Sequence, residues 1–271
     1  NNSSALYGAF ISKQVDVLLS NSIEDTLRYR LNLLSQKKEI KENKSAPIEI
    51  SFISLRTNKI PLNNTDIRLA IAKSLNRELI RNKVSFSLRN SATSLIPLIF
   101  KKDNSVSWPD FDPKESKRIF KEQGYCDGNP FNLPLTYRSN VPTDKLIAFY
   151  WQQSVKAEMK DCFSISLNGV ESTTIYKNLS EGIYPSVILD WTGAYSDPEA
   201  YLSPLLSCEK FIGNNCLKGE SVFSGSFWAS EKVEKLFKES ENVEGIERLN
   251  KLLEIEKIAS KSLPYVPIWA S

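Results

Sequence analysis

The sequence predicts an α/β fold in which a mixed β-sheet is flanked by helices. Strand-like runs alternate with segments of helical periodicity along all 271 residues, and no internal repeat or low-complexity segment interrupts them. The composition is 41% hydrophobic and 25% charged, which is ordinary for a globular domain. A chain of this length and composition can bury a sizeable core.

The first segment, up to Leu34, is predicted to form a helix, a strand and a second helix. Apolar residues share a helical face near residue 6, form a strand-like run over residues 15–19, and recur at helical spacing from Ile23 to Leu34. A polar, lysine-rich stretch over residues 37–45 follows. Because residues 48–55 then alternate apolar and polar side chains, a strand is predicted there, with a boundary between lobes near Pro47.

Two helices are predicted next from their starting signals. Asn64 or Thr65 precedes a run of apolar residues at helical spacing that ends at Leu79. After a loop that contains Pro97 and Pro109, a second helix is indicated by Asp112 and Pro113, with Glu115 in its first turn. This helix is expected to stop at Gly124.

The remainder continues the alternation. Strands are expected over residues 133–137, 163–167 and 186–191, and a final strand over residues 265–269. Between and after them, helices are expected from Thr143, around residues 173–179, from Asp197-Pro198, and over residues 230–240 and 243–262. The helix from Thr143 is predicted to turn Leu146, Ile147, Tyr150, Trp151 and Val155 toward the core.

Composition narrows the possible functions. The formal net charge is only +3 and its charges are scattered, which argues against nucleic acid as a partner. No window approaches the roughly 18 apolar residues of a membrane span. The chain has no histidine, so a Ser-His-Asp or Cys-His catalytic pair cannot be built and most zinc or nickel sites lose their usual ligand.

Four cysteines are present, and none has the C-x-x-C spacing of redox and zinc sites. They are either two disulfides or buried thiols. If bridged, Cys208 and Cys216 are expected to pair across the loop that contains Gly213, which leaves Cys126 with Cys162. Disulfides would indicate an oxidising compartment.

Several motifs, in order, resemble those of one protein family. Residues 15–17 are similar to its "G-E-V-D" strand, residues 66–78 to its "V-R-x-A-L-x-x-A-I-D-R" helix, and residues 111–125 to its "Y-D-P-x-K-A" helix, which ends in "A-G-Y". Residues 191–198 are similar to its "W-x-x-D-x-x-D-P" segment, and residues 263–268 to its closing "A-P-x-I-P-L". The family is the extracellular solute-binding proteins of the oligopeptide, dipeptide and nickel type, family 5.

The resemblance implies a lobe of the type II periplasmic binding protein fold, with a mixed sheet flanked by helices. It implies a receptor that captures a peptide or another small polar solute for an ABC importer by closure of two lobes. Metal complexes stay open as ligands, although the absence of histidine argues against direct metal ligation, and no cofactor or bound metal is expected. The expected partners are the solute and the permease subunits, and the expected location is the periplasm, with or without a lipid anchor. Neither nucleic acid nor a transmembrane segment of this chain is expected to take part.

Members of the family are about twice this long. On their plan, residues 1–47 belong to the first lobe, residues 48–266 form the second, ligand-binding lobe, and residues 267–271 begin the strand that crosses back. Most of the first lobe then lies outside this sequence.

The resemblance also implies ligand-binding residues. In dipeptide binders the fourth residue of "W-x-x-D" is an aspartate that pairs with the ligand ammonium, and here it is Ala194. Trp191, Thr192, Gly193 and Tyr195 remain as ligand contacts, although the two aromatics could equally be core or rim residues. Gly193 would let the backbone approach a ligand closely.

Arg138 lies where dipeptide binders carry the arginine that holds the ligand carboxylate. A guanidinium suits this task because it forms two parallel hydrogen bonds with a carboxylate. The alternative is an arginine on a surface loop without a ligand.

Two other classes of function stay open. Asp190, Glu171 and Asp197 could form the carboxylate pair of a hydrolase, although Asp197 already suits the start of a helix. A pure interaction module, without a small-molecule ligand, is the other. Turnover of chromogenic substrates would identify a hydrolase, and the absence of any effect of small molecules would identify the module.

Overall fold

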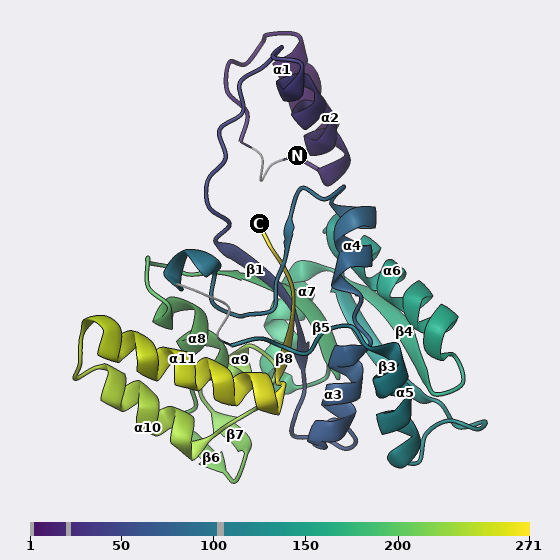
Figure 1. The fold of residues 1–271 in the computed structure, drawn as a ribbon, viewed down its shortest axis with the longest axis vertical. Helices are drawn as coiled ribbons and strands as arrows, with labels where there is room; N and C mark the ends of the chain where they lie inside the picture. The colour runs from purple at the N-terminus through teal and green to yellow at the C-terminus, as the bar shows by residue number, and fades with distance from the viewer. Residues whose placement is uncertain (1–2, 20–22, 102–105) are drawn as a thin grey trace.

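The structure is a computed structural model, and it describes residues 3–19, 23–101 and 106–271. Two helices near the N-terminus, α1 (Ser3–Ile11) and α2 (Asp25–Gln36), stand apart at one end of the long axis (Figure 1). An extended segment joins them to β1 (Glu49–Leu55), the first strand of the main body. The chain therefore separates into a small helical piece and a larger α/β body.

The body is built on a six-stranded mixed sheet, as the sequence predicts. Its strand order is β2-β8-β1-β5-β3-β4. β1 runs antiparallel to both of its neighbours, whereas the three strands beyond it are parallel to one another. The other strands are β2 (Asn90–Ser91), β3 (Phe131–Arg138), β4 (Phe163–Val170), β5 (Ser186–Thr192) and β8 (Tyr265–Ala270).

Helices lie to both sides of this sheet. Figure 1 shows α3 to α6 grouped on one side of the view and α8 to α11 on the other. Their bounds are α3 (Thr65–Lys73), α4 (Arg77–Val84), α5 (Pro113–Glu122), α6 (Pro142–Met159), α7 (Ser172–Asn178), α8 (Glu199–Leu206), α9 (Glu220–Phe223), α10 (Glu231–Ser240) and α11 (Gly245–Ser262). Short 3₁₀ turns, η2 (Leu98–Phe100) and η3 (Leu179–Glu181), complete the helical elements.

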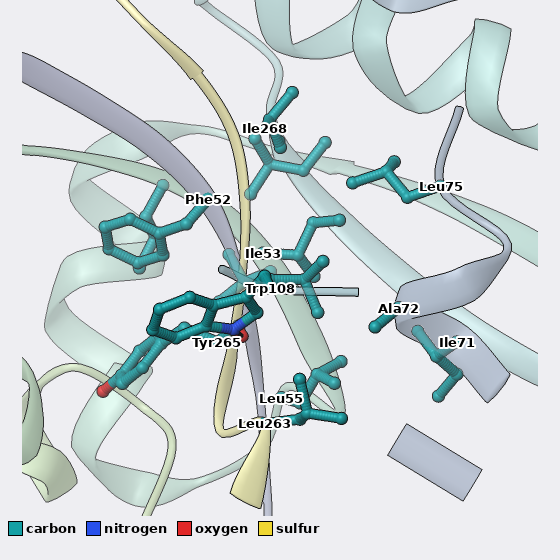
Figure 2. Packing of buried hydrophobic residues seen from close by; sticks show 14 of the residues in the cluster. Phe52, Ile53, Leu55, Ile71, Ala72, Leu75, Trp108, Leu263, Tyr265 and Ile268 are labelled. Carbon is teal, nitrogen blue, oxygen red and sulfur yellow. Dashed lines mark hydrogen bonds between the residues drawn. The ribbon is translucent and has the colours of Figure 1, made fainter. Parts of the chain in front are cut away.

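The central strands hold the core together. β1 is buried from Ile50 to Leu55, and β8 is buried from Tyr265 to Trp269. Figure 2 shows side chains of β1, α3 and β8 packed around Trp108. The indole nitrogen of Trp108 donates to the backbone oxygen of Tyr265 over 2.7 Å, so a loop far from β8 in sequence is fixed to it. Burial on this scale is the main stabilising contribution to the body.

Sequence signals located most helix ends correctly. Asn64 accepts a hydrogen bond from the backbone of Asp66 at the start of α3, and Asp112 does the same from Glu115 at the start of α5. The prediction of a single helix up to Leu79 is wrong, however. Asn76 accepts from the backbone of Leu79 and so begins a new helix, α4.

Two other expectations were wrong. Residues 15–19 form no strand, because nothing in the described parts of the chain pairs with their backbone and an isolated strand is not stable. Leu146 is 40% exposed, since α6 turns Ile147, Trp151 and Val155 toward the sheet and Leu146 lies off that stripe.

Both predicted disulfides are present. Cys126–Cys162 joins the segments that precede β3 and β4. Cys208–Cys216 spans a hairpin of two strands that the sequence did not reveal, β6 (Lys210–Ile212) and β7 (Asn215–Lys218). The bridges therefore fix one edge of the main sheet and one small hairpin.

Candidate functional site

One edge of the sheet gathers the residues that the sequence singled out. β3, β4 and β5 are parallel, so their last residues, Arg138, Val170 and Thr192, lie at the same edge. β1 starts there, because Glu49 pairs with Thr192, and β8 ends there at Ala270. Ligands of α/β sheets commonly lie at carboxyl ends of strands. We call this side of the molecule the ligand edge.

Arg138 is the most strongly connected side chain at the ligand edge. Its side chain is only 7% exposed. Nε donates to Oδ2 of Asp144 over 2.7 Å, and Nη2 donates to Oδ1 of the same carboxylate over 3.0 Å. Asp144 lies in the first turn of α6, where the helix dipole favours a negative charge. One side of the guanidinium fork is therefore paired within the body.

The other side of the fork is paired as well. Nη1 of Arg138 donates to Oδ1 of Asp190 over 3.0 Å and to the hydroxyl of Tyr176 over 3.1 Å, and Nη2 also donates to Oδ2 of Asp190. An arginine has five N–H donors. Asp144, Asp190 and Tyr176 take all five, so none is left for a ligand carboxylate in this arrangement.

The charges of Arg138, Asp144 and Asp190 do not cancel. Burial by itself would lower the pKa of Arg138, but the hydrogen bonds and charges of Asp144 and Asp190 outweigh burial and raise that pKa above its usual value. The arginine therefore stays positive. One positive and two negative side chains leave a net charge of about −1 when both carboxylates are ionised. Asp190 is the solvent-facing member, with 32% of its side chain exposed against 4% for Asp144.

The end of β5 and the segment after it lie at the same edge. Trp191 is half-buried, and its indole nitrogen donates to the backbone oxygen of Ala200 over 2.8 Å. Thr192 and Ala194 are exposed, and Tyr195 is 56% exposed. This places Ala194 at the surface and outside the core.

Gly193 has a packing role that the sequence did not indicate. A Cβ atom at this position would lie 2.6 Å from the ring of Tyr201, closer than real contacts allow. Tyr201 in turn donates its hydroxyl to the backbone oxygen of Ile48 over 2.8 Å. The close approach that requires a glycine is thus to Tyr201. Through its hydroxyl, Tyr201 connects the loop that contains Gly193 to the start of β1.

Asp197 has the capping role that was predicted. Its Oδ1 accepts from the backbone of Glu199 over 2.8 Å at the start of α8, and its Oδ2 pairs with Arg248 over 2.6 Å. Glu171 similarly caps α7 through the backbone of Thr173. Because Asp190 is engaged with Arg138, each of the three carboxylates considered for a hydrolase has a different structural partner.

The residues that sequence reasoning missed are Asp144 and Tyr176. No local pattern marks them as partners of Arg138, because Asp144 reads as a first-turn helix residue and Tyr176 as an apolar helix residue. The acidic character of Asp190 was noticed, but its pairing was not. The parallel alignment of β3 with β5 brings Asp190 beside Arg138.

The cavity at the ligand edge is small. A cavity of about 50 Å³ lies beside β1 and β8, lined by Pro47, Ile50, Ser91 and Ala270 among others. Small-molecule sites usually enclose roughly 300–1,000 Å³. Among the described residues no group of acidic or cysteine side chains could hold a metal ion, and no helix is long and apolar enough to cross a membrane. A ligand at this edge would need a second surface to enclose it.

Comparisons with known proteins agree with this architecture. Residues 1–212 match the description of the bacterial extracellular solute-binding proteins, family 5, middle segment. The dipeptide-binding protein of Pseudomonas aeruginosa is 22% identical over 244 residues, which cover 88% of this chain and 43% of that protein. Heme-binding protein A of Haemophilus influenzae is 25% identical over 205 residues, which cover 74% and 36%.

A solved structure has the same fold over the whole chain. HbpA2 of Haemophilus parasuis superposes with a TM-score of 0.80 at 20% identity, covering 100% of this chain and 51% of that one. The fold is thus that of a type II periplasmic binding protein. The chain spans about half the length of the relatives it matches.

Proposed function

The chain belongs to family 5 of the bacterial extracellular solute-binding proteins, and on that premise we propose that it supplies the second lobe of a receptor for an ABC importer. The observation that carries the proposal is the ligand edge, where Arg138, Asp190 and the segment from Trp191 to Tyr195 lie together and Thr192, Ala194 and Tyr195 are exposed. Two lobes that swing together would bury a solute there.

The division of the chain fits this proposal. The backbone N–H groups of Ile48 and Glu49 both donate to the oxygen of Ser271, so the two ends of the body lie side by side at the ligand edge. We propose that residues 1–47 belong to the first lobe, residues 48–266 form the second, and residues 267–271 lead back. The pairing of β8 continues through Ala270, so the returning segment shares its first residues with the sheet.

The proposed ligand is a peptide or another small polar solute. Relatives named for dipeptides, heme and nickel share the family, so membership alone does not select one ligand. We propose Thr192, Ala194 and Tyr195 as contacts, because they are exposed at the ligand edge, with half-buried Trp191 and Gly193 as their support. Arg138 takes part in the site through its ion pair with Asp190.

The proposed partners and location follow from the family. The receptor would deliver its solute to permease subunits after closure, in the periplasm, with or without a lipid anchor on the full-length protein. Two disulfides in 271 residues support an oxidising compartment.

Ligand binding by the full-length protein tests the proposal. Mass spectrometry of the purified protein would identify a bound solute, and that solute should raise the melting temperature of the protein. Calorimetry should then give a far weaker affinity for the 271-residue chain alone, because half of the contacts and the exclusion of water are missing. Equal affinities would contradict a two-lobed site, and turnover of the solute would favour a hydrolase.

A further inference from the structure

The pairing of Arg138 bears on which solutes the ligand edge accepts. Resting on the proposed receptor function, we propose that Asp190 withholds the guanidinium of Arg138 from ligand carboxylates. The receptor then selects solutes whose group at this position is uncharged or cationic, and it discriminates against a free carboxylate. Asp190 is in this sense a specificity-determining residue that acts through Arg138.

The first step of the argument is the geometry of the fork. A carboxylate is held best by two parallel N–H groups of one guanidinium. Asp144 occupies the pair formed by Nε and Nη2, and at 4% exposure it is inaccessible to a ligand. The remaining donors, on Nη1 and Nη2, point to Asp190 and Tyr176. A ligand carboxylate could bind only by displacing Asp190.

Displacement is unfavourable on two counts. Asp190 would lose two charge-assisted hydrogen bonds, each stronger than a neutral one. The incoming carboxylate would also meet a group in which two carboxylates already share one guanidinium, at an edge where like charges repel more strongly once water is excluded. An uncharged amide or an ammonium group meets neither obstacle.

The groups around Asp190 suit such an end of a ligand. Asp190 is 32% exposed, and each of its oxygens retains a lone pair beyond the bond to Arg138. The hydroxyl of Tyr176 accepts from Arg138 and keeps its own proton to donate. Tyr195 is 56% exposed on the neighbouring loop, and desolvation and the nearby Glu199 raise the pKa of its phenol, so the hydroxyl stays neutral.

The test compares two ligands that differ only at one end. Calorimetry on the full-length protein would measure the affinity for a dipeptide with a free carboxylate and for the same dipeptide as its C-terminal amide. The wild type is expected to favour the amide by about 10-fold or more, the size of one charge-assisted hydrogen bond. D190A should reverse this preference, because two N–H donors of Arg138 become free.

Matched variants separate this effect from a general change of charge. D190N keeps the shape and one acceptor oxygen, so it should reduce the preference without reversing it. E171Q removes a negative charge from the same edge without touching Arg138, and it should leave the ratio of the two affinities unchanged. The proposal is overturned if the wild type prefers the free carboxylate, or if folded D190A keeps the wild-type ratio.

A second probe does not depend on the peptide ligand. Acetate can be titrated into ¹⁵N-arginine-labelled protein while the guanidinium signals of Arg138 are followed by NMR. The expected result is no saturable shift in the wild type and a saturable shift in D190A. A saturable shift in the wild type, or none in D190A, would overturn the proposal. If neither dipeptide nor amide binds to any form, a peptide-receptor function fails, while acetate still decides whether Asp190 blocks Arg138.

Discussion

Two arginines at the ligand edge show how similar ion pairs connect different parts of the molecule. Arg138 pairs with Asp144 and Asp190, and all three belong to the body. Arg89, just before β2, pairs with Asp25 of α2 and donates to the hydroxyl of Ser271, while its guanidinium lies 4.6 Å from the ring centre of Trp269. One arginine organises the proposed binding surface within a lobe, and the other fixes the preceding helices to it.

The contacts around α2 are few by comparison. Besides Asp25, which also accepts from Thr143, the ring of Tyr29 stacks on Phe86 at 5.0 Å between centres. Helix α1 has no buried residue at all. Loss of a partner of Arg138 should therefore destabilise the whole body. Loss of a partner of Arg89 should weaken only the docking of α2.

The largest expected effect is at Asp144. Replacing it in D144A removes both acceptors from the buried side of Arg138 and should lower the free energy of unfolding by about 3–5 kcal/mol, as for other broken buried pairs. Urea unfolding measures this. E209Q, in the exposed pair of Glu209 with Lys218, is the control and should cost less than about 1 kcal/mol. Similar costs for both variants would mean that burial does not distinguish the two pairs.

The next effect comes from the disulfide Cys126–Cys162, which joins the segments before the two strands on the Arg138 side of the sheet. It closes 36 residues, so replacing both cysteines by serine should cost roughly 4 kcal/mol on the chain-entropy estimate, against about 2–3 kcal/mol for Cys208–Cys216, which closes only 8. Thermal unfolding of the two double variants compares them. Hydrogen exchange in α2 should be unaffected, and faster exchange there would show that α2 depends on the body more than its contacts indicate.

A smaller and local effect is expected at Asp25. In D25A, the guanidinium groups of Arg28 and Arg89 lose their shared acceptor, so local opening of α2 should become easier by about 1–3 kcal/mol. Hydrogen exchange followed by mass spectrometry would detect this in α2. The free energy of unfolding of the body, measured with urea, should change by about 0.5 kcal/mol or less. A large global loss would contradict the difference drawn between the two arginines.

The smallest effect should follow from R89K. Lysine keeps the positive charge but loses the planar fork and the stacking on Trp269, so about 1 kcal/mol of docking free energy should be lost. The same hydrogen-exchange measurement on α2 tests it. An effect as large as that of D25A would mean that geometry, and not charge alone, holds α2.

The sequence by itself determined what local chemistry controls. Asp112 and Pro113 are local signals for the start of a helix, and Asp197 caps the helix that follows it. The close spacing of Cys208 and Cys216 makes their disulfide sterically easy. Alternating apolar patterns gave the mixed α/β fold, because the period of apolar residues reports which faces are buried. Motif resemblance gave the family.

Tertiary structure alone decided which side chains the predicted site residues contact. The sequence predicts for Arg138 either a ligand carboxylate or a place on a surface loop, and it does not reveal Asp190 as a partner, because Asp190 is 52 positions away in the chain and meets Arg138 only after β3 and β5 align in parallel. The sequence predicts that Gly193 lets the backbone approach a ligand, and only the tertiary structure reveals that the ring of Tyr201 packs against it. A pattern of residue types does not contain these pairings, because a guanidinium or a glycine is compatible with many partners, and the packing of distant segments selects one.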